Sequence, residues 1–306
     1  MAQADLAVSR LLSCLKRGDL AIMGKVVAIA VVAVIVVAGV SYFVGHGVLV
    51  TGDARSVANV ALQSAGKHAL DYDSVLKLTS SAPPLSASSS ASFGQIKQAA
   101  DSYVAREDQA RAEIRSDRAG LRSADGALRA TAQNPLMAPF RSNLDQPQRR
   151  VESMIAALDA ADAGLGVQRD EMHATAAFMD VMSVYTTLGN REEAGDVAGS
   201  LAMFTTLDPK VQTMLQAVQP KDVPPHEVAI SRAVAAVVAD EKAVLMAKQA
   251  HDANRTKAAL ARFDTDSAAV DNVDTIQIDS EERAMLQPYV DRFEGNLKAA
   301  GFGLSG

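Results

Sequence analysis

The pattern of apolar and polar positions opens on an uncharged stretch, Val26 to Gly52, bounded by Lys25 and Asp53. A helix rises about 1.5 Å per residue, so crossing a hydrocarbon core of about 30 Å takes about 20 residues. The stretch is long enough for one crossing. The pattern therefore predicts a single transmembrane signal-anchor helix over residues 26–47, with the lipid bilayer as its partner.

Charges flank this stretch unequally, and their distribution predicts its orientation. Lysine and arginine concentrate on the cytoplasmic side of membrane spans. We therefore expect residues 1–25 in the cytoplasm, and the remainder of the chain in an extracytoplasmic location. The residues before the span that carry this argument are Arg10, Lys16, Arg17 and Lys25, against Asp5 and Asp19.

Two alternatives remain open at the N-terminus. Residues 1–25 place apolar side chains three and four apart, which predicts an amphipathic helix along the inner membrane surface, although a plain basic leader has the same composition. A cleaved secretory signal is the competing interpretation of the span, because small residues such as Gly45 and Gly47 follow its apolar part. The length of the segment before the span favours an uncleaved anchor.

Beyond the span the pattern changes twice. Residues 48–78 have helical spacing and predict a juxtamembrane helix. Residues 79–92 read TSSAPPLSASSSAS, a serine- and proline-rich composition that predicts an exposed linker. Residues 93–306 are assigned to one helical bundle domain.

Two long helices dominate the predicted bundle, because apolar residues alternate three and four apart over many turns. The turn at Asn134-Pro135 separates them, and Pro147 suits the first turn of the second helix. A short connection favours an antiparallel, coiled-coil-like hairpin. The two stripes are Phe93, Ile96, Ala100, Tyr103, Glu107, Ala110, Ile114, Asp117, Leu121, Ala124 and Leu128, then Val151, Met154, Leu158, Ala161, Leu165, Gln168, Met172, Thr175, Met179 and Met182.

The remaining chain predicts shorter helices. Gly189-Asn190 ends the second long helix, and two short helices follow, the second capped by Asp208 with Pro209 in its first position. Pro224-Pro225 opens a helix to about Phe263 whose middle, Lys248 to Lys257, is polar enough to lie on the outside or to break. Ser280 is the predicted cap of a last helix. The fold class is therefore all-α: one transmembrane helix followed by an elongated extracytoplasmic bundle.

Composition narrows the function. Aromatic residues make up 4% of the chain and tryptophan is absent, so the helices must pack on narrow alanine- and valine-rich faces. The formal charge of −6 argues against nucleic-acid binding. The single cysteine, Cys14, falls in the predicted cytoplasmic segment, so the outer part has no disulfide, and lipidation of Cys14 is an alternative to chance occurrence.

The residues that usually carry chemistry form no known constellation. The five histidines are scattered, and no phosphate loop or nucleophile motif occurs. Methionines at seam spacing, among them Met172, Met179 and Met182, favour core filling over soft-metal binding. The acidic run from Asp264 to Glu282 suggests calcium, yet Ala268 and Thr275 stand where an EF-hand needs ligands. We therefore expect no catalytic, cofactor-binding or metal site.

These observations lead to two hypotheses of function, and a third, catalytic one stays open without any site motif to support it. The first is a non-enzymatic scaffold or protein-interaction module of the cell envelope, which binds a protein partner or a second copy through its helical seams. Glu107, Asp117 and Gln168 motivate it, since such side chains in a seam suit a specific partner. The second is a sensor-like helical domain that binds a small ligand and signals through a partner protein.

Overall fold

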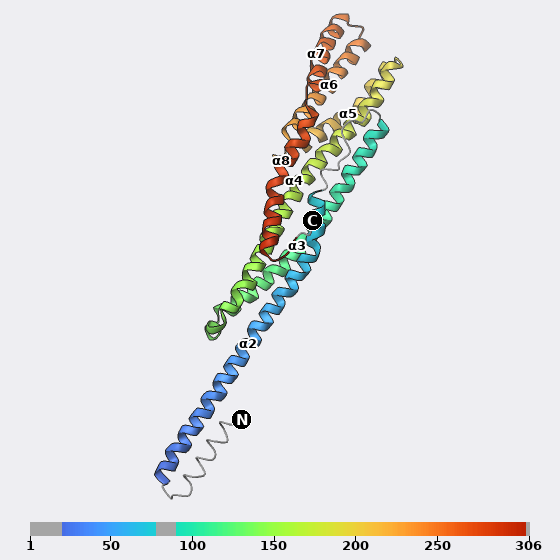
Figure 1. Cartoon of the computed structure of the whole chain (residues 1–306). Helices are drawn as coiled ribbons and strands as arrows, with labels where there is room; N and C mark the ends of the chain where they lie inside the picture. Colours follow the sequence, from blue (N-terminus) through green and yellow to red (C-terminus); the bar gives the residue numbers. More distant parts are fainter. Residues whose placement is uncertain (1–19, 78–89, 304–306) are drawn as a thin grey trace. The chain divides into compact units, whose positions relative to one another are not determined.

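The computed structural model describes residues 20–77 and 90–303 of the chain (Figure 1). Every regular element within these ranges is a helix, which confirms the all-α prediction. The predicted linker and the segment that contains Cys14 lie largely outside the described residues. The elements are α2 (Leu20–Leu76), α3 (Ser90–Gln133), the 3₁₀ helix η2 (Pro135–Phe140), α4 (Ser142–Glu193), α5 (Val197–Ala217), α6 (Pro225–Gln249), α7 (Ala253–Asp271) and α8 (Thr275–Ala299).

Helix α2 changes character along its length. In the described part of the chain it is the one helix long and apolar enough to span a membrane, and it lies near the N-terminus. Between residues 33 and 49 nearly every side chain is exposed; Val34 is 68% and Leu49 67% exposed. Farther along, one face of the helix is buried. The buried residues are Thr51, Ala54, Ala58, Leu62, Ala65, Ala69, Tyr72 and Leu76.

The chain forms two compact units. Unit 1 comprises residues 1–59 and 124–148. Within it, η2 forms the turn between α3 and α4, and Asn134 caps it by accepting a hydrogen bond from the backbone N–H of Leu136 at 3.0 Å. Phe140 packs on α2: its ring lies 6.2 Å from that of Phe43, and a Cβ built on Gly47 would overlap it.

Unit 2 comprises residues 60–123 and 149–306. Here α3 and α4 are antiparallel, as their ion pairs show: Asp108 meets Arg169 at 2.9 Å, whereas Arg118, farther along α3, meets Asp159, which comes earlier in α4, at 2.6 Å. The predicted apolar stripes of both helices face inward. Buried members include Ile114, Leu121, Val151, Met154, Leu158, Ala161, Leu165 and Gln168.

Helices α5, α6 and α8 of unit 2 pack on α4. Helices α6 and α7 lie side by side, and α5 and α8 also contact α6 (Figure 1). An apolar cluster joins α4, α5 and α6. It contains Val181, Leu188, Phe204, Leu207, Val211, Met214, Val234, Val238 and Leu245.

Several predicted helix boundaries were wrong because burial outweighed local signals. Helix α4 begins at Ser142 and holds Pro147 in its interior; buried Leu144 stabilises the turn ahead of the proline. Similarly, α5 is one helix with Pro209 inside, since Leu207 and Val211 on either side are buried in the apolar cluster.

The predicted caps were also wrong. Asp196 caps α5 by accepting a hydrogen bond from the Gly199 N–H at 2.9 Å, whereas Asp208 binds Lys242. Ser280 lies inside α8, which begins at Thr275. The start at Pro225 is confirmed, and the polar middle of that predicted helix is where α6 ends and α7 begins.

Glycine permits a close contact of three helices, α2, α4 and α8, within unit 2. A Cβ built on Gly164 of α4 would lie 2.8 Å from Leu76 Cδ2 and 3.1 Å from the Cβ of Tyr289. The side chain of residue 164 therefore has no room, because three helices meet there. Gly120 of α3 is the opposite case, with nothing within 4 Å of a Cβ.

We expect Gly164→Leu to lower the free energy of unfolding by about 1–3 kcal/mol, because a side chain forced into a packed interface displaces its neighbours. The matched variant Gly120→Leu should be neutral, or more stable by up to about 1 kcal/mol, since leucine favours a helix over glycine. Denaturant titration of the full-length chain in detergent measures both. Equal effects of the two substitutions would contradict the close contact at Gly164.

Candidate functional site

Four buried glutamates, each from a different helix of unit 2, form the most unusual chemistry of the described residues. Glu107 of α3 and Glu171 of α4 are each 4% exposed, and Glu227 of α6 and Glu282 of α8 are each 6% exposed. Glutamate is seldom buried to this extent, because an ionised carboxylate loses its hydration in a helical interior. We call these four residues the carboxyl cluster.

Glu171 and Glu282 share a hydrogen bond. Two carboxylates cannot donate to each other, so one of the pair carries a proton. Burial, followed by the neighbouring charges of Glu282 and Glu227, raises the pKa of Glu171 well above its ordinary range. The hydrogen bond of this pair joins α4 to α8.

Glu227 is held on the other side of the cluster. Its Oε1 accepts a hydrogen bond from the Thr175 hydroxyl of α4 at 3.2 Å, while its Oε2 has no partner among the described residues. Burial raises the pKa of Glu227 to about 8, with a smaller contribution from Glu282, although the Thr175 hydrogen bond acts in the opposite direction. Glu227 is consequently mostly uncharged at pH 7.

Glu107 completes the cluster from α3. Burial raises its pKa to about 8, and Arg169 and Arg111 lower it only in part. Both arginines are engaged by aspartates, since Arg111 binds Asp162 at 2.8 Å and Arg169 binds Asp108. Hence neither of these two guanidinium groups is reserved for Glu107, and the raised pKa favours its protonated form.

The start of α6 is fastened next to the cluster. Glu281 of α8 accepts a hydrogen bond from the backbone N–H of His226 at 3.0 Å, and its other oxygen lies 2.6 Å from the His226 Nδ1. A carboxylate at a helix N-terminus satisfies free N–H groups and complements the helix dipole. The pair thereby sets the positions of the adjacent Glu227 and Glu282.

Carboxyl groups from several helices are also the donor set that hard metal ions prefer. In the described part of the chain, however, no group of three or more histidine, cysteine, aspartate or glutamate side chains is arranged to hold a metal ion.

A second carboxyl pair lies farther along α4. Glu192 and Glu241 of α6 share a hydrogen bond, and Glu241 also accepts one from the Tyr185 hydroxyl at 3.0 Å. Partial burial, then Glu241, raises the pKa of Glu192 to about 7. This carboxyl pair joins α4 to α6.

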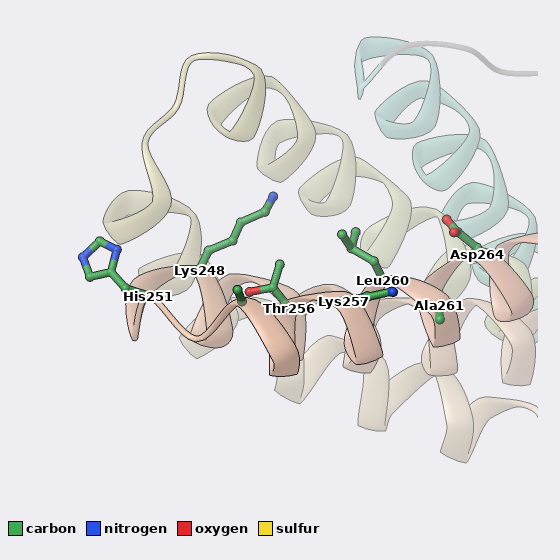
Figure 2. A pocket seen from close by; sticks show the side chains of 8 residues that line it. Lys248, His251, Thr256, Lys257, Leu260, Ala261 and Asp264 are labelled. Carbon is green, nitrogen blue, oxygen red and sulfur yellow. The ribbon is translucent and has the colours of Figure 1, made fainter.

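A surface groove lies where α6 ends and α7 begins. Its volume is about 760 Å³, and Lys248, His251, Lys257 and Asp264 contribute its charged or ionisable side chains. Figure 2 shows His251 at the turn between the helices, at the opposite end of the groove from Asp264. His251 has a φ of 54°, a left-handed conformation that glycine usually supplies at this position after a helix.

The residues that motivated a partner-binding seam point into the chain instead. Asp117 accepts hydrogen bonds from the Tyr72 hydroxyl at 2.8 Å and pairs with His68 at 2.9 Å. Gln168 donates to the carbonyl oxygen of Leu76 at 3.0 Å. Glu107 is buried as well, so all three side chains lie inside unit 2.

Sequence reasoning missed three members of the carboxyl cluster. A usable signal exists, because Glu227 shares the stripe of Ser231, Val234 and Val238 at helical spacing. Glu282 likewise falls in line with buried Leu286 and other apolar residues of α8. An acid inside an apolar stripe marks a candidate for burial; the partners of that acid are not visible in the sequence.

The other candidates from the sequence do not converge. Met172 and Met179 pack in apolar clusters, and Asp264 to Asp271 of the acidic run are helical in α7. Comparison with protein-family models, with curated proteins and with solved structures found no match to this chain.

The carboxyl cluster predicts that stability falls as pH rises. Unfolded glutamate has a pKa of about 4.3, so between that value and the raised folded values the folded chain binds more protons than the unfolded chain. The contribution is fully present below about pH 4.3 and lost as pH rises through about 8. We expect Glu227→Gln to raise stability at pH 8 by about 1–3 kcal/mol and to change it little at pH 5.

Thermal melts of the full-length chain in detergent, followed by helical circular dichroism, test this expectation. Glu193→Gln is the matched control, because Glu193 is an exposed glutamate on α4. Parallel pH profiles for the parent chain and Glu227→Gln would show that Glu227 ionises normally in the folded state.

Proposed function

We propose that this chain is a membrane-anchored helical module that binds a protein partner or a second copy of itself and catalyses no reaction. Its N-terminal residues lie in the cytoplasm in this proposal, and the helical bundle lies on the extracytoplasmic side. The observation that carries it is the exposed apolar surface of α2. Water would meet large aliphatic side chains all around that helix between residues 33 and 49.

The energetics support a lipid environment for this segment. Full exposure of a valine or leucine side chain forgoes about 1.5–3 kcal/mol that burial would provide. Val34, Ile35, Val37 and Leu49 are each more than 60% exposed, and Tyr42 is 75% exposed. Lipid acyl chains would cover this surface, and the tyrosine ring suits the membrane–water interface.

The chemistry inside unit 2 supports a non-catalytic role. The carboxyl cluster is closed off from solvent, and its polar contacts join helix to helix. Asp117 of α3 pairs with His68, a contact that resembles the one that orients a general base. The same carboxylate accepts a hydrogen bond from Tyr72, so it also fastens α2 to α3. These groups stabilise the packing of helices.

A partner would need a surface that the intramolecular packing leaves exposed. The outer face of α2 in unit 2 offers one: Val60 is 66% and Leu70 55% exposed, with exposed Lys67 between them at helical spacing. Apolar side chains on one face of a helix are what a second helix packs against. We assign the partner contact to this outer face.

Cross-linking in the native membrane, followed by the solution mass of the detergent-extracted chain, tests the interaction. We expect a discrete oligomer or one recurrent cross-linked neighbour, and its loss in Leu70→Glu. Leu260→Glu is the matched control, because Leu260 is an exposed leucine, 41% exposed, on α7. A lone monomer with no neighbour would contradict the interaction role.

A second candidate function is a sensor that binds a small anion in the groove between α6 and α7. The groove volume of about 760 Å³ lies within the range of small-molecule sites, about 300–1,000 Å³. Lys248 and Lys257 supply positive charge to the groove, and Asp264 is the one carboxylate among the residues that line it.

Thermal shift with inorganic phosphate and with citrate tests this second candidate. A ligand at one hundred times its Kd should stabilise the chain by about 2.7 kcal/mol and raise its Tm. The double variant Lys248→Gln, Lys257→Gln should lose the shift, while Lys221→Gln, an exposed lysine outside the groove, should keep it. An equal shift in all three proteins would contradict binding in the groove.

A further inference from the structure

The turn between α3 and α4 exposes apolar side chains that the packing of unit 1 leaves uncovered. The sequence of η2 is PLMAPF, without a charge. Met137 is buried, but Leu136 is 60% exposed, and Pro135, Ala138 and Pro139 are exposed too. We call residues 135–140 the apolar tip.

The apolar tip is held at a defined level of α2, within the same compact unit. Phe140 lies against Gly47, and a Cβ there would overlap its ring. The Phe140 ring also approaches the Phe43 ring, with a centroid distance of 6.2 Å and an angle of 43° between the planes. The tip therefore sits beside the last turns of the apolar stretch.

Two features of α2 place those turns at the outer edge of the hydrocarbon. Asp53, the first charge after the stretch, is six residues beyond Gly47, or about 9 Å along the helix. Tyr42 and His46 stack one turn apart, with ring centroids 5.8 Å apart, and both are exposed. Amphipathic rings of this kind mark the level where acyl chains meet headgroups.

We infer that the apolar tip is a second membrane contact, inserted into the acyl-chain and headgroup boundary of the outer leaflet beside α2. This inference rests on the proposed membrane anchorage. Apolar segments bind this boundary at a depth of about 5–10 Å. We choose the bilayer as the occupant because the exposed aliphatic groups of the tip lie next to the apolar surface of α2, which lipid also covers in this proposal.

Tryptophan fluorescence measures this contact directly, because the natural chain has no tryptophan. Three single-tryptophan variants of the full-length chain are reconstituted in phosphatidylcholine vesicles whose acyl chains carry bromine, a contact quencher. Val40→Trp reports the anchor, Leu136→Trp reports the tip, and Leu260→Trp on α7 is the matched exposed control. Helical circular dichroism verifies folding, and Ala138→Trp replaces Leu136→Trp if the latter unfolds.

We expect strong quenching and blue-shifted emission for Val40→Trp and Leu136→Trp, and neither effect for Leu260→Trp. Quenching of Val40→Trp without quenching of Leu136→Trp would overturn the tip contact and leave the anchor intact. Unquenched Val40→Trp would overturn both. Blue-shifted, unquenched Leu136→Trp would show a protein covering the tip, and equal quenching of Leu260→Trp would show general adsorption; either result would overturn the inference.

Discussion

Close approach of helices on small side chains is the constraint on which this structure depends. With 4% aromatic residues and no tryptophan, the chain cannot fill wide gaps between helices. It packs on fully buried alanines such as Ala58, Ala65 and Ala161, and on Gly164, where a Cβ would meet two neighbouring side chains. Burial in such interfaces removes polar side chains from water, which favours a partner inside the chain or the uncharged form of an acid.

The carboxyl cluster follows from this constraint. Glu107, Glu171, Glu227 and Glu282 come from four helices, and the two arginines that act on Glu107 are already paired with aspartates. Burial raises the pKa values of Glu107, Glu171 and Glu227, which favours the protonated form of each carboxyl. The expected fall of stability with rising pH comes from the same groups that fill the interface.

Unit 1 differs in the surface that it exposes. Most side chains of α2 between residues 33 and 49 are apolar and exposed, and the apolar tip adds exposed Leu136 close to Gly47. In water such groups forgo the stabilisation that burial provides, whereas lipid in the proposed anchorage would cover them.

The sequence by itself determined the helical class, the apolar segment and the buried stripes of α3 and α4, because apolar periodicity reports directly which helix face is buried. It also placed the turn at Asn134 and the start of α6 at Pro225, where proline geometry acts locally. The helix starts predicted at Pro147, Pro209 and Ser280 were wrong. Packing of neighbouring residues such as Leu144 and Leu207 outweighs a local cap or a lost hydrogen bond.

Only the tertiary structure decided which polar residues meet. Glu171 and Glu282 are distant in the chain, as are Asp117 and Tyr72, and nothing in their local spacing distinguishes an intramolecular contact from a surface offered to a partner. Helical periodicity specifies the face on which a residue lies. The register and proximity of another helix, set by contacts along the whole interface, specify what that residue faces.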